Sequence, residues 1–169
     1  SFNLCVPRSH CPQCKKQIPF WWNIPILGFI FLRGKCAYCY KRISFNYFLV
    51  EIISAVATVV VFQHFGTSLQ MPELLLFTYG LIALSFIDFN HQFLPDTITF
   101  SLLWLGLIVS TQHIFTDPTN AIFGVIVGYL FLWLIAKMYL LLRKKEGMGL
   151  GDCKMLAMIG AWVGVTALL

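Results

Sequence analysis

Charged residues are scarce in this sequence: Asp, Glu, Lys and Arg make up 11% of its 169 residues, whereas 59% are hydrophobic. Soluble domains usually carry about 25% charged residues. A soluble chain of this length could not bury so much apolar surface, because a large share of it would stay in contact with water. The mean hydropathy of +0.79 agrees with this. The composition therefore excludes an ordinary soluble domain and indicates a protein that crosses a membrane several times.

Acidic residues are even scarcer, seven against twelve Lys and Arg, and the net charge is +5. The basic residues do not form a stripe with interleaved aromatic residues, so no nucleic-acid partner is expected. Seven of them lie in residues 1–47 and four in residues 143–154, whereas residues 66–73 and 116–120 have none. Because loops rich in Lys and Arg stay in the cytoplasm, we expect residues 1–47, 90–97 and 143–154 on that side of the membrane.

Long hydrophobic runs fill the rest of the chain. They cover residues 48–65, 74–89, 98–115 and 121–142, and a fifth run begins near Met155. A helix needs about 20 apolar residues to cross the hydrocarbon core, and backbone groups in lipid must bond within their own segment. We therefore expect an all-α polytopic membrane protein, with a bundle of about five transmembrane helices in residues 48–169 after a small domain in residues 1–47. Since the chain begins without Met and ends inside a run, it resembles a fragment with both ends missing.

The short connections between the runs carry residues that start helices. Pro72 suits the first turn of the second predicted helix, where its missing N–H costs no hydrogen bond. Asp96 and Asp117 precede the third and fourth helices, and an aspartate there can accept hydrogen bonds from the first free N–H groups. We therefore predict both aspartates as N-caps.

Four of the six cysteines form two C-x-x-C pairs, Cys11 with Cys14 and Cys36 with Cys39. Two such tight turns supply the tetrahedral set of four sulfurs that a structural zinc ion prefers. The alternatives are two disulfides or redox-active pairs, but a cytoplasmic location disfavours disulfides, and neither pair has a βαβ context. Four thiolates would also close the coordination sphere, so the predicted zinc is structural and fixes residues 1–47.

Two aspartates lie at the ends of predicted membrane helices. Asp88 falls in the last turn of the second run, and an ionisable group in a membrane helix is a functional hypothesis by default. Asp152 opens the fifth run, directly after Gly149 and Gly151, whose lack of a Cβ would let the backbone run close to a substrate strand. By the predicted topology both carboxylates lie at the cytoplasmic end of their helices and can approach each other.

Two close carboxylates share one proton, so one can act as a base and the other as an acid, as in aspartic proteases. An ion or proton path through a helix bundle would explain the same pair. The glycines before Asp152 could equally form a loose turn between helices. The residues alone favour neither a peptidase nor a transporter.

The motifs stand in a familiar order: the two cysteine pairs, then Phe86-Ile87-Asp88 with Leu94-Pro95-Asp96, then Glu146-Gly147-Met148-Gly149-Leu150-Gly151-Asp152-Cys153-Lys154. In this order they resemble the bifunctional type IV prepilin leader peptidase/N-methyltransferases of Gram-negative bacteria. The resemblance implies a GxGD-type intramembrane aspartyl peptidase of the inner membrane with Asp88 and Asp152 as its catalytic pair. Its substrates would be prepilins and pseudopilins, cleaved between Gly and usually Phe at the cytoplasmic face.

The resemblance also implies methylation of the new amino terminus with S-adenosylmethionine. Gly34 matches a glycine associated with methyl transfer, and Glu51 matches an acidic position at the start of the next helix. The residues alone point to no methyl donor, because no glycine-rich nucleotide loop follows a strand. From its position one turn into the first run, Glu51 is expected to pair with Lys41 or Arg42.

Other functions fit parts of the sequence. One is a small membrane transporter or channel subunit with a zinc-knuckle regulatory domain. Another is a structural assembly protein that docks through its cysteine domain. A peptidase without methyl transfer is the nearest alternative among enzymes.

Overall fold

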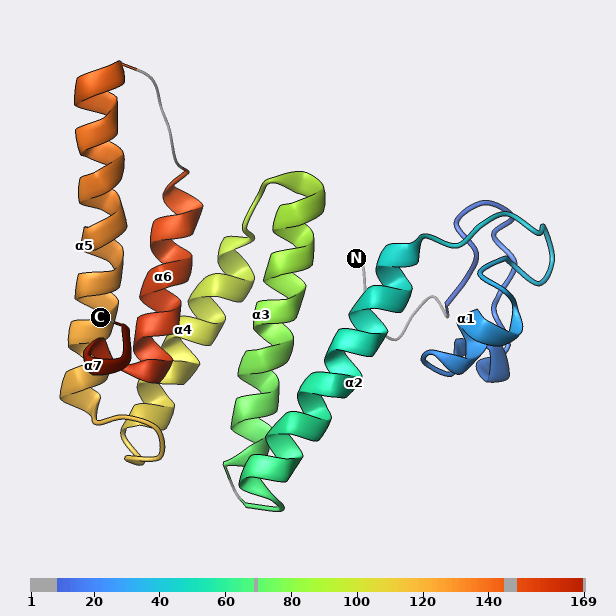
Figure 1. The fold of residues 1–169 in the computed structure, drawn as a ribbon, viewed down its shortest axis with the longest axis horizontal. Coiled ribbons are helices and arrows are strands. Elements are labelled where there is room, and N and C mark those ends of the chain that lie inside the picture. Colours follow the sequence, from blue (N-terminus) through green and yellow to red (C-terminus); the bar gives the residue numbers. More distant parts are fainter. Residues whose placement is uncertain (1–8, 69, 145–148, 169) are drawn as a thin grey trace. The chain divides into compact units, whose positions relative to one another are not determined.

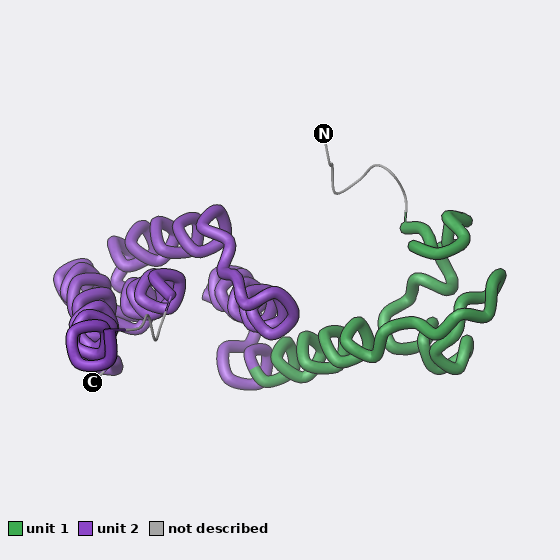
Figure 2. Tube along the Cα trace, turned by 90° about the horizontal axis from the view of Figure 1, so that it is seen from above, with its two compact units in different colours: residues 1–60 green, residues 61–169 purple. Residues whose placement is uncertain are grey.

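The computed structural model describes residues 9–68, 70–144 and 149–168, and it is mostly helical (Figure 1). Helical structure was the expectation for the hydrophobic runs, and it is confirmed. The elements are η1 (Phe20–Asn23), α1 (Leu27–Phe31), α2 (Phe45–Phe65), α3 (Met71–His91), α4 (Asp96–Ser110), α5 (Pro118–Arg143), α6 (Leu150–Val163) and α7 (Val165–Leu168). The chain divides into two compact units, residues 1–60 and residues 61–169 (Figure 2).

Three helices among the described residues, α2, α3 and α5, are long and apolar enough to cross a membrane. They have 21, 21 and 26 residues, and at about 1.5 Å per residue each reaches roughly the 30 Å of a hydrocarbon core. The protein itself buries only 6% of the most apolar window of each helix. This combination of length and apolar composition is typical of membrane-spanning helices. The helices α4 and α6, with 15 and 14 residues, are shorter, at roughly 22 Å each.

The predicted helix starts are correct for Pro72 and for Asp117, and wrong for Asp96. Pro72 lies in the first turn of α3. The N-cap of α4 is Pro95, and the carboxylate of Asp96 accepts hydrogen bonds from Lys154 instead. Asp117 stands at the N-cap position of α5, but its side chain makes no capping bond and lies 2.7 Å from His113 Nδ1. The charged Lys154 is a stronger partner for a carboxylate than a free backbone N–H is.

The core of the second unit is built around α6, which lies between α4 and α5. At the α5–α6 contact, a Cβ added to Gly124 would come 2.3 Å from the carbonyl oxygen of Gly160, so the two backbones nearly touch. On the other side, Trp162 Nε1 donates to the Leu102 carbonyl of α4 at 2.8 Å. The Trp162 ring also stacks on Phe77 of α3, with ring centroids 4.6 Å apart. These contacts fix α6 against three neighbouring helices.

From residue 9 onward, the first unit has few buried residues and is held by local contacts around α1. The Phe29 ring stacks on Phe48 at 4.6 Å and meets Phe45 edge-on at 6.5 Å. The Ile26 N–H donates to Glu51 Oε2 at 2.7 Å. Since these partners belong to the first two turns of α2, α1 is packed beside the beginning of that helix.

The contact between Gly124 and Gly160 makes a prediction for stability. Replacing Gly124 by Ala should force α5 and α6 apart and lower the free energy of unfolding by about 1–3 kcal/mol, the usual cost of overpacking. Thermal unfolding of the purified protein in detergent would measure this loss. Ile122→Ala, at an exposed position of the same helix, is the matched control. An unchanged midpoint for Gly124→Ala would contradict the close packing.

Candidate metal centre and aspartate pair

The two C-x-x-C pairs of the first unit form turns with the same backbone conformation. The residue after the second cysteine has a left-handed conformation in both, with φ 54° at Lys15 and 57° at Tyr40. Each turn is also flanked by an isolated antiparallel bridge. The equivalent hydrogen bonds run from Cys11 N–H to Lys16 O at 3.0 Å, from Lys15 N–H to Cys11 O at 2.8 Å, from Cys36 N–H to Lys41 O at 2.9 Å and from Tyr40 N–H to Cys36 O at 3.0 Å.

These turns bring four sulfur atoms into one cluster. The Sγ atoms of Cys11, Cys14, Cys36 and Cys39 all lie within 4.8 Å of one another, and those of Cys11 and Cys39 are 3.8 Å apart. A tetrahedral zinc with Zn–S bonds of about 2.3 Å holds its sulfurs about 3.8 Å apart. The cluster therefore fits a tetrahedral metal ion.

The four cysteines are free thiols and form no disulfide with one another, so the disulfide reading of the pairs is wrong. The two turns are joined by other contacts. Lys41 Nζ donates to Gln13 Oε1 at 2.6 Å, and Lys16 Nζ lies 5.0 Å from the centre of the Tyr38 ring. Each contact runs from one turn to the other, so the sulfurs are brought together without a covalent link.

The backbone prepares part of this cluster for metal binding, since the thiolate is the metal ligand. Hydrogen bonds from the N–H groups of Cys14 and Gln13 lower the pKa of Cys11 to about 6. The N–H groups of Cys39 and the residue before it lower the pKa of Cys36 in the same way. A hydrogen bond from the Lys41 N–H stabilises the thiolate of Cys39 and lowers its pKa. Desolvation and the neighbouring thiols have the larger combined effect and raise the pKa of Cys39 to about 11. A cation at the centre would favour all four thiolates at once.

Asp88 lies in the last turn of α3. The helix ends where Gln92 adopts a left-handed conformation and its N–H donates to the Asp88 carbonyl at 2.7 Å. The Asp88 side chain is exposed, whereas Leu84, one turn earlier, is fully buried. Residues four apart share a face of a helix. Asp88 therefore lies on the same face of α3 as Leu84, the face that packs against the rest of the second unit.

Asp152 lies in the first turn of α6. The helix begins at Leu150 after Gly149, earlier than the start near Met155 expected from hydrophobicity. Asp152 is half-buried and Cys153 beside it is fully buried. The part of the predicted motif before Gly149, from Glu146 to Met148, lies outside the described residues.

The aromatic contact between α3 and α6 fixes the level of both aspartates. The two helices run in opposite directions (Figure 1), and Phe77 stacks on Trp162. Asp88 follows Phe77 by eleven residues and Asp152 precedes Trp162 by ten, so both lie about 15 Å from the aromatic pair, toward the same end of the second unit. Eleven residues of an α-helix make about three full turns, so Asp88 and Phe77 leave the axis of α3 in directions that differ by only about 20°. Asp88 therefore lies on the side of α3 that faces α6.

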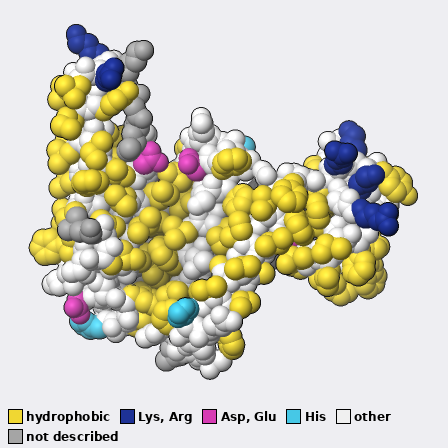
Figure 3. All heavy atoms as spheres, in the orientation of Figure 1, with side chains coloured by type: hydrophobic (Ala, Val, Ile, Leu, Met, Phe, Trp, Pro, Cys, Tyr) yellow, Lys and Arg dark blue, Asp and Glu magenta, His cyan; other side chains and the backbone are white. Residues whose placement is uncertain are grey.

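Two further contacts join the turn after Asp88 to the start of α6. A Cβ added to Gly151 would lie 3.3 Å from the Leu94 side chain, so the α6 backbone passes close to buried Leu94. Lys154 Nζ donates to both carboxylate oxygens of Asp96, at 2.7 and 2.9 Å. Acidic side chains gather where α4 and α6 begin (Figure 3). The sequence did not reveal this ion pair, because 58 positions separate its partners.

The predicted partner of Glu51 is wrong. Its carboxylate accepts the Ile26 N–H and bonds neither Lys41 nor Arg42. Ile26 precedes α1 and has a φ of 65°, and the first N–H groups of a helix have no partner within the helix. Glu51 satisfies one such N–H and connects the start of α1 to α2.

A pocket in the first unit adjoins Glu51. Its volume is about 1080 Å³, and its lining includes Glu51, Phe29 and the buried cysteines Cys11 and Cys36. Gly34 is not among the lining residues but packs on one of them: its φ is 68°, and an added Cβ would lie 3.0 Å from the Phe29 ring. Glycine suits that turn because other residues rarely adopt its conformation. The structure thus relates Gly34 and Glu51 to one pocket, Glu51 directly and Gly34 through Phe29.

Uncovered apolar helices and a cluster of four cysteines define a helical membrane protein with a candidate metal-binding unit at its start. Comparison with known families identifies the family to which the chain belongs. The family model described as "Bacterial Peptidase A24 N-terminal domain" matches residues 1–65. The family model described as "Type IV leader peptidase family" matches residues 75–169. The chain belongs to the type IV leader peptidase family.

Curated relatives carry the name prepilin leader peptidase/N-methyltransferase. The one from Stutzerimonas stutzeri is 48% identical over 97% of this chain and 57% of its own length. The one from Pseudomonas aeruginosa is 45% identical over the same shares, and the one from Neisseria gonorrhoeae is 44% identical over 99% of this chain and 59% of its own length. The chain thus spans little more than half of these relatives. No solved structure matches it significantly.

The four-sulfur cluster predicts bound zinc. The purified protein should contain about one equivalent, and the double variant Cys11→Ser, Cys14→Ser should lose it, because two of the four ligands of a tetrahedral site are gone. Elemental mass spectrometry after gel filtration would measure the content. Cys153→Ala is the control, since Cys153 lies outside the cluster and should keep the metal. Zinc retained by the double variant would refute the assignment.

Proposed function

We propose that the full-length protein is a membrane-embedded aspartyl endopeptidase with Asp88 and Asp152 as its catalytic pair. Its substrates would be type IV prepilins and pseudopilins, whose leader it would remove at a Gly-Phe bond on the cytoplasmic face. The main support is the shared level of two carboxylates at facing helix ends in a chain of this family. The names of the relatives support the same substrate class, and Gly149 and Gly151 would leave room for an extended substrate beside Asp152.

The proposed mechanism uses one water molecule. The ionised Asp152 takes a proton from this water, whose oxygen attacks the carbonyl carbon of the scissile glycine. Protonated Asp88 donates its proton to the carbonyl oxygen, which balances the charge that develops there. The C–N bond then breaks, and the proton held by Asp152 passes to the leaving amine. As the carbonyl re-forms, one hydroxyl of the tetrahedral intermediate gives its proton back to Asp88, which restores the starting pair.

The topology that we propose has five membrane-embedded helices, α2 to α6, in a bacterial inner membrane. Its support is the exposed apolar face of α4 and the enclosure of α6 between α4 and α5. A helix enclosed in this way need not span the full hydrocarbon core by itself. Lys and Arg flank the start of α2 and the end of α5, so residues 1–47, Asp88 and Asp152 would face the cytoplasm.

Residues 1–47 would form a domain with structural Zn²⁺ on its four cysteines, and residues 48–169 the peptidase core. We assign methylation of the new amino terminus to the pocket beside Glu51. S-adenosylmethionine, when bound, supplies an activated methyl group on a positively charged sulfur. Glu51 suits this charge, because it is the sole acidic residue among the first 72 and it lines the pocket. Gly34 would shape the pocket through Phe29.

Replacing either catalytic aspartate by Asn should abolish leader removal. Each change removes one proton-transfer group, so cleavage should fall by about 100-fold or more in Asp88→Asn and in Asp152→Asn. The assay is co-expression of the full-length protein with a prepilin, followed by mass spectrometry of the product. Asp117→Asn, at the start of α5, is the matched control and should cleave normally. A transporter or a structural protein would show no cleavage in any variant, and near-normal cleavage by either test variant would end the proposal.

The role of Glu51 can be separated from leader removal. Glu51→Gln keeps an oxygen for the Ile26 N–H but loses the negative charge, so methylation should fall about tenfold or more while cleavage stays unchanged. Mass spectrometry of the processed amino terminus distinguishes the two products by one methyl group. Full methylation by this variant would remove Glu51 from the proposed site. Equal loss of cleavage and methylation would point instead to a general structural role.

A further inference from the structure

Six apolar side chains of η1 and α1 are exposed on the first unit. Trp22 lines the pocket beside Glu51, and the other five are Phe20, Trp21, Leu27, Ile30 and Phe31. We refer to these five as the aromatic surface. The three from α1 recur at the spacing that places residues on one face of a helix. η1 packs directly on α1, since a Cβ added to Gly28 would collide with the carbonyl of Trp22. The five side chains thus form a surface and not scattered single exposures, and such a surface marks a contact with a partner.

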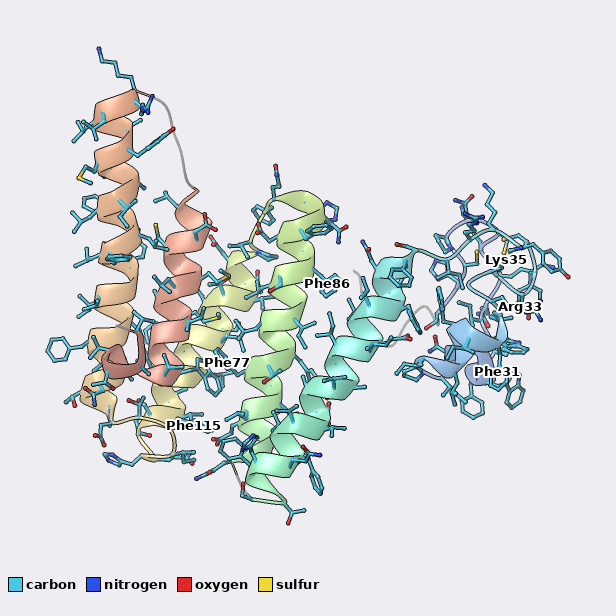
Figure 4. The ribbon with its side chains drawn as sticks, in the orientation of Figure 1. Phe31, Arg33, Lys35, Phe77, Phe86 and Phe115 are labelled. Atoms are coloured by element: carbon cyan, nitrogen blue, oxygen red, sulfur yellow. The ribbon has the colours of Figure 1, made fainter. Side chains whose placement is uncertain are left out.

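The charge around this surface has one sign. Residues 1–50 contain seven Lys and Arg and no Asp or Glu. In Figure 4, Phe31 and Lys35 lie toward opposite sides of the first unit, with Arg33 between them. An apolar side with tryptophan and phenylalanine next to a basic side is typical of a segment that lies in a membrane interface.

The position of α1 along α2 gives the depth of the aromatic surface. Phe29 packs on Phe45 and Phe48, and Ile26 bonds Glu51. These partners cover the first 9 Å or so of a helix about 31 Å long. If the 21 residues of α2 fill the hydrocarbon core of about 30 Å, α1 lies at the boundary between headgroups and acyl chains. Interfacial helices enter the bilayer to about this depth, roughly 5–10 Å.

We propose that the aromatic surface is immersed in the lipid interface of the leaflet that holds the start of α2, with anionic phospholipid as its partner. This inference rests on the proposed membrane crossing of α2. The basic residues supply the charge complementary to anionic headgroups. They also disfavour a second copy of the chain as the partner, because the seven basic residues of one copy would repel those of the other.

The test is photo-crosslinking of the full-length protein in nanodiscs of phosphatidylglycerol and phosphatidylethanolamine. p-Benzoyl-phenylalanine is placed at Phe31, which is 72% exposed, or at the control Tyr40, which is 75% exposed on the second cysteine turn. A third variant carries it at Val59 of α2, which is 54% exposed. After irradiation, mass spectrometry identifies lipid or peptide adducts. We expect at least about tenfold more lipid adduct at Phe31 than at Tyr40, since the first side chain is in lipid and the second in water.

The three positions separate the possible failures. Lipid adducts at Val59 without any at Phe31 would overturn the inference and leave the membrane crossing of α2 intact. No lipid adduct at Val59 would refute the crossing itself and the inference with it. Peptide adducts at Phe31 would show that a protein segment or a second copy covers the aromatic surface. Equal lipid labelling at Phe31 and Tyr40 would also overturn the inference, because no particular surface would then be immersed.

Discussion

The close packing of α6 against α4 and α5 is the constraint on which the arrangement of the second unit depends. Between helices in lipid there is no hydrophobic driving force, so contact relies on small residues and interhelical hydrogen bonds. Gly124 and Gly160 provide the first, and the bond from Trp162 to Leu102 provides the second. Because Trp162 also stacks on α3, the same contacts set the level of Asp152 relative to Asp88. A shift of α6 by one turn would move Asp152 about 5.4 Å along the bundle.

The first unit depends on a different kind of constraint. Its described residues include few buried side chains, so little hydrophobic burial is available to define its fold. Four sulfurs within 4.8 Å of one another would hold both turns at once if they share a metal, and metal binding then supplies folding free energy. The bond from Ile26 to Glu51 attaches α1 to a helix that the bilayer would itself hold in place under the proposed topology. The membrane and the metal would thus replace the missing core.

Local patterns in the sequence predicted much of this structure. Hydrophobic runs gave the helices because lipid requires internally bonded backbone, and the C-x-x-C spacing gave the sulfur cluster because each pair forms one tight turn. The pairings over long sequence distances were not predicted. Asp96 reads as an N-cap from its neighbours alone, and its true partner Lys154 is 58 positions away. Glu51 reads as a partner for nearby Lys41, because nothing in the sequence shows that the chain brings the Ile26 N–H within 2.7 Å.

The two aspartates differ in their positions within their helices, and this difference, which the sequence did not reveal, affects how well each holds a negative charge. A negative charge is stabilised in the first turn of a helix and destabilised in the last, typically by 0.3–1 kcal/mol at exposed sites. Asp152 lies in a first turn and Asp88 in a last turn. Lys154 would add to this preference, but its charge is matched by the two oxygens of Asp96. The helix ends therefore favour Asp152 as the base and Asp88 as the acid in the proposed mechanism.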